Sequence, residues 1–353
     1  MKEINFAVLS AVFCGCFLGA GFLSGNELLQ FFGNFGFMGV VGCFFSVFLI
    51  SFFSGTVIKI AKHKKTNNPE RILFPSRYHK SSLMFGVLQV ALTFSITVIM
   101  LSGITTLLNQ LTNINRIILG VFFTFLLFVI AVKGNIIVAK IFSYIIPVII
   151  IFTFMISFVL LKKANYQIDF HINNSNNPLL KNWVLSALTY VSYSVIYAVA
   201  AFSSYGKAIK NGKDIWVGVF LGGALMFLLA LSIMFSIFSV PNAQKGELPM
   251  FLAAANINST TGCVFSVLLV LGMFSAALTA GSSLVNYINI KLVLSKKYKE
   301  IAAAIIFLTA FFCSVFKFGN LIGTIYPTFG YFGFVVLFLL ILNLIHIKTN
   351  TNY

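Results

Sequence analysis

Residues 19–27 read Gly-Ala-Gly-Phe-Leu-Ser-Gly-Asn-Glu and interrupt a long apolar stretch near the N-terminus. Each glycine weakens a helix by about 1 kcal/mol relative to alanine. Ser24 with Glu27 three residues later is a capping-box pattern, which indicates that a helix begins afresh. In hydrocarbon, an unwound backbone is tolerated only where protein or a polar cavity satisfies it. The segment therefore predicts two half-helices joined by a linker, although the glycines alone would also suit close helix packing.

Such a linker could bind charged groups of a ligand. Its free amides and the positive end of the second half-helix favour an anionic group such as a carboxylate, and the carbonyls that end the first half favour a cation. A later apolar segment carries tyrosines and serines that could form the opposite wall of a polar pocket, although ordinary aromatic packing explains each of them equally well. The predicted substrate-binding residues are Gly19, Ala20, Gly21, Phe22, Ser24, Gly25, Tyr193, Ser194 and Tyr197.

Glu27 is the one acidic residue that we place at membrane depth. The other six lie in predicted loops or tails: Glu3, Glu70, Asp169, Asp214, Glu247 and Glu300. An ionisable side chain inside a membrane is a candidate functional residue. Glu27 is therefore the candidate for proton coupling, with helix capping at the Ser24 amide as the alternative interpretation.

A second set of polar residues lies in the segment 274–283. Thr279, Ser282 and Ser283 are spaced to share one helical face, where they could offer oxygen ligands to a cation. Small hydroxylated residues also serve plain helix packing, so that alternative stays open. We expect no resident metal site, because no histidine or carboxylate lies near the five cysteines. An enzyme is disfavoured, since no nucleophile–base pair or paired carboxylates lie at membrane depth.

The elements that position these residues are membrane-spanning helices. Hydrophobic residues make up 59% of the 353 and charged residues 9%, which is too little charge to cover a soluble domain of this size. The hydropathy breaks predict an all-α integral membrane protein with ten spans, near 5–32, 36–60, 81–109, 115–132, 136–161, 182–206, 215–240, 261–290, 300–316 and 320–346.

The net charge of +17 follows from orientation rather than from nucleic-acid binding. Of the 24 Lys and Arg, 18 lie at the termini and in alternate loops. This bias predicts a multi-pass protein of the bacterial cytoplasmic (inner) membrane with both termini in the cytoplasm.

The chain also shows an internal repeat at an offset of 180 residues. Pro147 and Pro327 are both mid-helix prolines, and the two longest predicted helices start at 81 and 261. Five helices followed by five more predict an inverted repeat, with residues 1–162 as the first copy and 182–347 as the second within a single transmembrane domain. Coincidence in low-complexity apolar sequence is the alternative.

The motif Gly19–Glu27 followed by Phe31-Phe32-Gly33 resembles the first-helix signature of bacterial YkvI-type membrane proteins. The resemblance runs through nearly the whole chain and includes residues 193–206 and the basic loop after the second helix. Those proteins are similar to the amino acid–polyamine–organocation superfamily, with the LeuT-like fold. The resemblance implies a pocket between helices 1, 3, 6 and 8. Helix 6, as the repeat partner of the broken helix 1, is expected to be interrupted as well.

The same resemblance implies a cation site in helix 8. Sodium-coupled members carry Ala-Gly-Leu-Thr-Ser there, and the similar stretch here starts at Ala276 and reaches Thr279 and Ala280. Ala276 would offer its carbonyl and Thr279 its hydroxyl. Ala280 replaces the serine, so Ser282 or Ser283 would have to supply the missing hydroxyl to a sodium ion.

These observations predict a symporter, coupled to Na⁺ or H⁺, for a small organic solute such as an amino acid. Its expected partners are that solute and the lipid bilayer, with no cofactor beyond the coupling ion. The alternative is a transporter-like membrane subunit that senses a ligand without transporting it.

Overall fold

The structure is a computed structural model that describes residues 5–66, 68–74, 79–133, 136–164, 177–207, 209, 211–240, 242–292 and 296–350. Within these residues the chain forms helices and no strand. The α-helices are α1 (Phe6–Phe17), α2 (Ala20–Leu23), α3 (Asn26–Phe31), α4 (Phe37–His63), α5 (Pro69–Leu73), α6 (His79–Thr112), α7 (Arg116–Lys133), α8 (Ile136–Lys163), α9 (Trp183–Phe202), α10 (Gly212–Phe238), α11 (Pro249–Ile257), α12 (Ser259–Leu292), α13 (Lys296–Cys313) and α14 (Phe318–Asn350). Short 3₁₀ helices are η1 (Gly33–Phe35), η2 (Ser203–Lys207) and η3 (Ala243–Lys245).

Six helices of the described chain are long and apolar enough to cross a membrane, namely α4, α6, α9, α10, α12 and α14. Large apolar side chains cover the outside of the molecule; Phe48, Phe122 and Phe312 are 49%, 54% and 63% exposed. Lipid is the solvent in which such a surface is stable. The chain is therefore a multi-pass membrane protein. Each of the ten ranges predicted from the sequence contains helix, whereas the count of ten spans stays a prediction.

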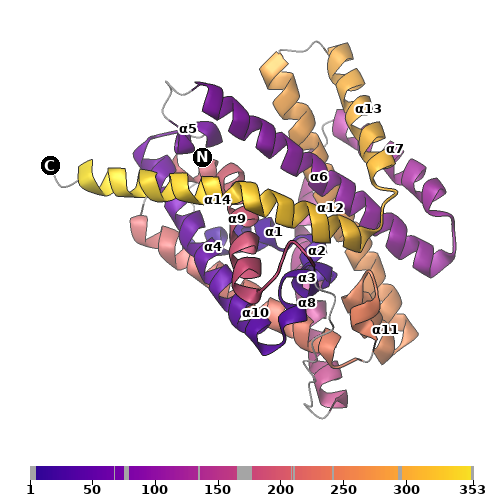
Figure 1. Cartoon of the computed structure of the whole chain (residues 1–353). Coiled ribbons are helices and arrows are strands. Elements are labelled where there is room, and N and C mark those ends of the chain that lie inside the picture. Colours follow the sequence, from indigo (N-terminus) through magenta and orange to yellow (C-terminus); the bar gives the residue numbers. More distant parts are fainter. Residues whose placement is uncertain are drawn as a thin grey trace.

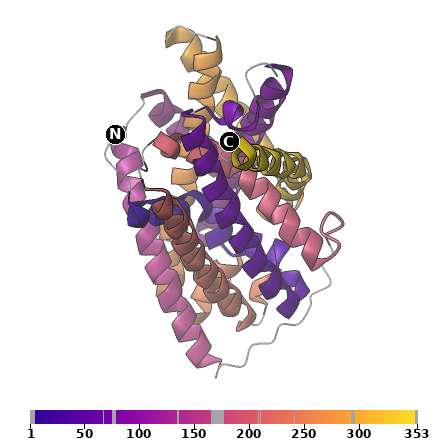
Figure 2. The ribbon, with the colours of Figure 1, turned by 90° about the vertical axis from the view of Figure 1, so that its left-hand side faces the viewer.

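The helices pack in two groups (Figure 1). One group contains α1, α4, α9 and α10, and the other contains α6, α7, α12 and α13. α8 contacts α10 and α12, and α14 contacts α9 and α6, so these two helices join the groups. Figure 2 shows α4, α8 and α10 running lengthwise beside one another.

Helix lengths agree with the 180-residue offset. α6 and α12 have 34 residues each and start at His79 and Ser259. α7 and α13 have 18 residues each and start at Arg116 and Lys296. Within each pair the two helices pack against each other: α6 against α12, and α7 against α13. The equal lengths support the predicted repeat, while its boundaries at 1–162 and 182–347, and the inversion, remain predictions; residues 1–4 lie outside the described chain.

Two short helices lie near opposite ends of the molecule, α5 and α11 (Figure 1). α5 begins with proline after Asn68, whose side chain accepts a hydrogen bond from the Glu70 amide. Proline at the first position of a helix sacrifices no intrahelical bond and presets its backbone angle. α11 likewise begins with Pro249. Pro69 of α5 lines the cavity described below, whereas no described residue of α11 does.

Candidate functional site

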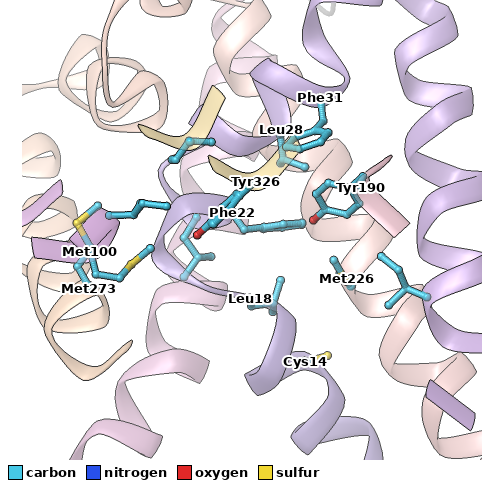
Figure 3. Close-up of a cluster of buried hydrophobic side chains, with 14 of the residues drawn as sticks. Cys14, Leu18, Phe22, Leu28, Phe31, Met100, Tyr190, Met226, Met273 and Tyr326 are labelled. Carbon is cyan, nitrogen blue, oxygen red and sulfur yellow. The ribbon is translucent and has the colours of Figure 1, made fainter. Parts of the chain in front are cut away.

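The helical path of residues 6–31 is interrupted twice. α1 ends at Phe17, and the amides of Leu18 and Gly19 donate to the carbonyls of Cys14 and Phe17, each at 2.8 Å. After the four residues of α2, a second interruption at Ser24 and Gly25 precedes α3. Figure 3 shows Leu18 at the end of α1, with Phe22 beyond it in the buried cluster.

The second interruption depends on Gly25. Its φ of 79° is left-handed, a conformation that favours glycine. A Cβ there would lie 2.3 Å from Cδ1 of Ile237 on α10. Both the backbone angle and the close approach of α10 therefore exclude a larger residue at this position.

The predicted capping box is not formed, and this expectation was wrong. Gly25, not Ser24, is the N-cap of α3, and it makes no side-chain cap bond. The Ser24 hydroxyl donates to the Gly21 carbonyl at 2.8 Å and accepts from the Asn26 amide at 3.4 Å. The Glu27 carboxylate, instead of returning to the Ser24 amide, accepts a hydrogen bond from the hydroxyl of Tyr193 on α9. The reason is tertiary: α9 supplies a buried donor that the local sequence does not reveal.

The half-helix predicted beyond the linker also differs in form. It consists of α2, with four residues, and α3, with six. Helices this short have little macrodipole, because only a few peptide units align. The expected attraction of a carboxylate to the positive end of one long half-helix therefore loses its basis.

A cavity of about 490 Å³ lies beside these interruptions. Its walls come from α1, α2 and α3 together with α6, α9, α12 and α14. Nine of the residues singled out from the sequence line it: Gly19, Gly21, Glu27, Tyr193, Ser194, Tyr197, Ala276, Thr279 and Ser283. Their position on one cavity follows from packing; their individual roles remain predictions.

The remaining sequence candidates do not line this cavity. Phe22 and Ser24 are fully buried, and Gly25 faces Ile237 of α10. Ser282 is half-buried beside the lining residue Ser283. The side chain of Ala20 lies outside the described part of the structure. These residues shape the interruption or support its surroundings.

Glu27 lies at the centre of an aromatic cluster. Tyr193 stacks on Tyr326 of α14 with ring centroids 4.8 Å apart and planes 13° apart. Tyr190 is perpendicular to Tyr193 at 5.3 Å. Gly21 leaves room for the carboxylate, because a Cβ there would lie 2.9 Å from Glu27 Oε2. The cavity thus combines one carboxylate with several tyrosine rings and hydroxyls.

The charge of the cavity is unbalanced. Glu27 is 5% exposed, and in the described part of the chain no Lys, Arg or His joins it in the lining. Burying a carboxylate without a compensating charge costs several kcal/mol (order of magnitude). A proton, a metal cation or a cationic group of a ligand would each supply that charge.

α9 holds its tyrosines in place through contacts on two sides. The Ser46 hydroxyl of α4 donates to the Ala187 carbonyl at 3.1 Å, and the Ser192 hydroxyl donates to the Gly330 carbonyl of α14 at 2.6 Å. A Cβ at Gly333 would lie 2.4 Å from the Ser192 carbonyl oxygen. This close packing of α14 on α9 brings Tyr326 against Tyr193.

α9 runs without interruption from Trp183 to Phe202 and then becomes the 3₁₀ helix η2. The change at Ser203 lies 180 residues after Leu23 of α2. The interruption predicted for the sixth helix therefore has its nearest counterpart at this change of helix type, beyond the cavity-lining tyrosines.

Sequence reasoning missed several cavity residues. Tyr326 directly precedes the mid-helix Pro327, and this position is the sequence signal that could identify it. Gln89 and Thr93 of α6 lie one helical turn apart in an apolar segment, which is the spacing of a polar face. The side-chain nitrogen of Gln89 is buried and has no hydrogen-bond partner among the described residues. Cys16 of α1 also lines the cavity.

The predicted cation ligands lie on α12, which lines the same cavity as the end of α1. Thr279 and Ser283 expose their side chains, and Ala280 is buried. The end of α1 and the two residues that follow it contribute residues 15–19 to the same cavity, and helix C-termini carry carbonyls without intrahelical partners. Within the described residues, no group of three His, Cys, Asp or Glu could hold a metal ion. On α12 the oxygen atoms available to a cation are those of backbone carbonyls and hydroxyls, and Glu27 supplies the carboxylate in the lining of the same cavity.

Hydrogen bonds tie α5 to the scaffold at one end of the cavity. Pro69 of α5 and Tyr287 of α12 both line it. The Glu70 carboxylate accepts from the hydroxyl of Ser82 on α6 at 2.6 Å and from that of Tyr287 at 3.2 Å.

The start of α11 and the loop before it contact the second interruption. The Met250 amide donates to the Ser24 carbonyl at 2.9 Å, and the Asn26 side chain donates to the Glu247 carbonyl at 2.9 Å. The Phe318 amide of α14 donates to Glu247 Oε2 at 3.0 Å. This loop therefore links α3 to the start of α14.

Two relatives match nearly the whole chain. It is 23% identical over 330 residues to the membrane protein YkvI of Bacillus subtilis (strain 168), covering 92% of this chain and 91% of YkvI. It is 24% identical over 346 residues to the protein YyaD of the same organism, covering 93% of this chain and 94% of YyaD. No family model matches the chain.

Three solved structures share its architecture. MhsT in complex with L-phenylalanine matches with a TM-score of 0.58 and 14% identity, over 89% of this chain and 81% of MhsT. Mhp1, a nucleobase-cation-symport-1 family transporter, matches with a TM-score of 0.58 and 13% identity, over 91% of this chain and 74% of Mhp1. A Na⁺-coupled sialic acid symporter matches with a TM-score of 0.58 and 12% identity, over 88% of this chain and 72% of the symporter. The chain has the fold of these transporters. The YkvI-type, LeuT-like resemblance seen in the sequence is thereby confirmed, and these neighbours are transporters rather than enzymes.

Proposed function

We infer that this protein is a secondary transporter, a symporter that couples uptake of a small organic solute, with an amino acid as the leading candidate, to Na⁺ or H⁺. One observation carries the proposal: the cavity lies between the interrupted α1–α3 segment, α9 and α12, in a chain with the fold of known symporters. Interrupted helices that line a polar cavity are typical of transporters of this kind.

The cavity suits an amphiphilic solute. Its volume lies in the range of small-molecule sites, which combine apolar walls with a few polar groups. Glu27 offers acceptor oxygens, and the unpaired Gln89 nitrogen offers donors. We propose that the solute is held among Gly19, Gly21, Tyr193, Ser194 and Tyr197, with Gln89 as a further donor to its anionic or carbonyl end.

Coupling has two candidate sites in this proposal. Ala276 and Thr279, aided by Ser283, would hold Na⁺ against the carbonyls that end α1, and Glu27 would carry H⁺. α1–α3, α4, α9 and α10 would move against the other helices to expose the cavity to each side in turn. We propose ten spans in the bacterial cytoplasmic membrane, with both termini in the cytoplasm.

A thermal-stability screen of the purified protein tests this proposal. Amino acids, amines and nucleobases would each be added with Na⁺, with K⁺ and at two pH values. A bound solute raises the melting temperature by mass action. A shift that requires Na⁺ supports the α12 site, and a shift that follows pH and is lost in Glu27→Gln supports proton coupling. Absence of any solute-dependent shift would contradict a solute cavity, and solute binding without uptake would favour a ligand-sensing subunit.

A further inference from the structure

The outer surface of α4 and α10 carries a row of aromatic side chains that lies outside the cavity. The two helices run side by side (Figure 2), and aromatic pairs bridge them along their length. Phe44 and Phe48 are 51% and 49% exposed, so the row faces lipid. This aromatic seam consists of Phe44 with Phe227, Phe48 with Phe220, and Phe52 with Trp216, whose ring centroids are 5.4, 5.4 and 5.8 Å apart.

Both strips of aromatic residues end at a lysine. On α4, Lys59 follows Phe52 by seven positions and therefore shares its helical face. On α10, Lys213 precedes Trp216 by three positions and shares the face of that residue. The pairs of the seam show that the helices are antiparallel, so Lys213 lies level with Gly55, and Lys59 lies one turn further along α4. The two lysines are therefore at the same end of the seam.

The charge of these two lysines is not balanced by neighbouring side chains. Lys213 is exposed and Lys59 is half-buried. Within the described part of the chain, neither side chain makes a hydrogen bond or an ion pair. Asp214 is adjacent to Lys213 in sequence, but the helical spacing turns it to the face of α10 opposite Trp216. Lys62 and His63 at the end of α4 add further basic groups.

Trp216 lies between the apolar seam and this basic end. Gly55 lets the indole rest against α4, because a Cβ there would lie 2.7 Å from Cζ3 of Trp216. Phe52 stacks on the indole with planes 29° apart. The indole N–H donates to no residue that the structure describes. A tryptophan at a membrane interface places its ring among acyl chains and directs its N–H toward the headgroups.

We propose that this end of the seam binds an anionic phospholipid. Lys59 and Lys213 hold the phosphate, the Trp216 N–H donates to the headgroup, and an acyl chain lies along the aromatic rings. Charge complementarity selects this ligand, since lysines at a membrane surface attract anionic lipid. The rings beside them would be left without a partner by a soluble anion. None of these residues lines the cavity, so the site does not depend on the proposed transport function.

The sequence supplies two fluorescent reporters for a test, because Trp183 and Trp216 are the two tryptophans of the chain. Trp183 lies beside Gly42, toward the other end of α4. The full-length protein with Trp183→Phe reports on the seam, and the protein with Trp216→Phe reports on ordinary lipid contact.

Both proteins would be placed in vesicles of phosphatidylcholine and phosphatidylglycerol at a ratio of about 4:1. In one set the phosphatidylglycerol carries bromine, which quenches tryptophan, and in the other an equal amount of the phosphatidylcholine carries it. We expect brominated phosphatidylglycerol to quench Trp216 at least about threefold more than brominated phosphatidylcholine. Trp183 should be quenched equally by the two lipids.

Variants in the Trp183→Phe protein assign the preference to the two lysines. Lys59→Gln combined with Lys213→Gln should abolish the excess quenching by phosphatidylglycerol, whereas Lys59→Arg combined with Lys213→Arg should retain it because both charges remain. Lys297→Gln on α13 removes another exposed lysine, away from the seam, and should also retain the excess.

Several results would overturn the lipid site. They are equal quenching of Trp216 by the two brominated lipids, an unchanged excess in the double Gln variant, and the same excess at Trp183. Loss of the excess in Lys297→Gln would show an effect of overall charge and would reject the site as well. Soluble glycerol phosphate should leave the quenching unchanged, and relief of quenching by it would assign the lysines to a free phosphate instead of a lipid.

Discussion

The hydroxyl of Tyr193 on α9 donates a hydrogen bond to the carboxylate of Glu27 on α3, across 166 positions of sequence. This bond joins the interrupted first segment to the helix that forms the opposite wall of the cavity. It also gives a buried carboxylate one of the donors that it needs away from water.

Tyr193→Phe should therefore lower the free energy of unfolding by about 1–3 kcal/mol, because the buried carboxylate loses a donor. The same substitution in a Glu27→Gln background should cost less, since a neutral amide needs less compensation. Thermal unfolding of the four proteins in one detergent gives the double-mutant cycle. Equal costs in both backgrounds would show that the pair does not interact energetically.

Gly21→Ala should displace Glu27, because the new Cβ would lie 2.9 Å from Oε2. We expect destabilisation of about 1–3 kcal/mol, the range for an overpacked interior. Gly212→Ala at the start of α10 is the matched control, because a Cβ there meets nothing within 4 Å. Melting temperatures measure both changes, and similar values for the two variants would contradict the close approach of Gly21 and Glu27.

Glu70→Gln should loosen α5 at its end of the cavity, because a neutral amide accepts more weakly from Ser82 and Tyr287 than a carboxylate does. Cys16 is a native reporter, since it lines the cavity. With the other four cysteines replaced by serine, we expect a polar thiol reagent to label Cys16 several-fold faster in Glu70→Gln. Glu300→Gln, whose carboxylate is absent from the lining, should keep the parent rate. An unchanged rate in Glu70→Gln would argue that α5 does not restrict access.

Lys64, just after α4, gives a pH-dependent prediction. Its ammonium donates to the Ile72 carbonyl at 3.0 Å and to Asn343 Oδ1 of α14 at 2.7 Å. Partial burial lowers the pKa of Lys64 from its usual value of 10.5. The unfolded chain therefore binds more protons than the folded one between the lowered pKa and 10.5, and in this window the contribution of Lys64 to stability rises with pH.

Lys64→Met should accordingly cost more stability at about pH 10 than at about pH 8, because the wild-type contribution grows over that interval. Melting curves of both proteins across this range measure the difference. A difference that shrinks with rising pH would contradict the assigned direction of the pKa change.

Hydropathy alone was sufficient to locate helix in all ten predicted ranges, because long apolar runs bounded by charge leave few alternatives. The 180-residue offset likewise anticipated the equal lengths of α6 and α12. The glycines of residues 19–27 indicated an interruption because their cost to a helix is local.

The contacts within the site were harder to predict from the sequence, because the packing of distant helices determines which side chains meet there. The capping box failed since the Tyr193 hydroxyl, and not the Ser24 amide, reaches Glu27. Tyr326 reaches Tyr193 because Gly330 and Gly333 let α14 approach the backbone of α9. Local sequence patterns do not specify how two distant helices align against each other. For this reason the sequence did not predict Tyr326 as a site residue, although it predicted the mid-helix Pro327 beside it.

Uptake by proteoliposomes tests the central claim most directly. Vesicles containing the purified protein would receive a labelled solute identified in the stability screen, under an inward Na⁺ gradient and, separately, an inward proton gradient. The account predicts accumulation driven by one of these gradients and, where the proton gradient is the driver, loss of that accumulation in Glu27→Gln. Saturable binding of the solute with no uptake under either gradient would contradict it.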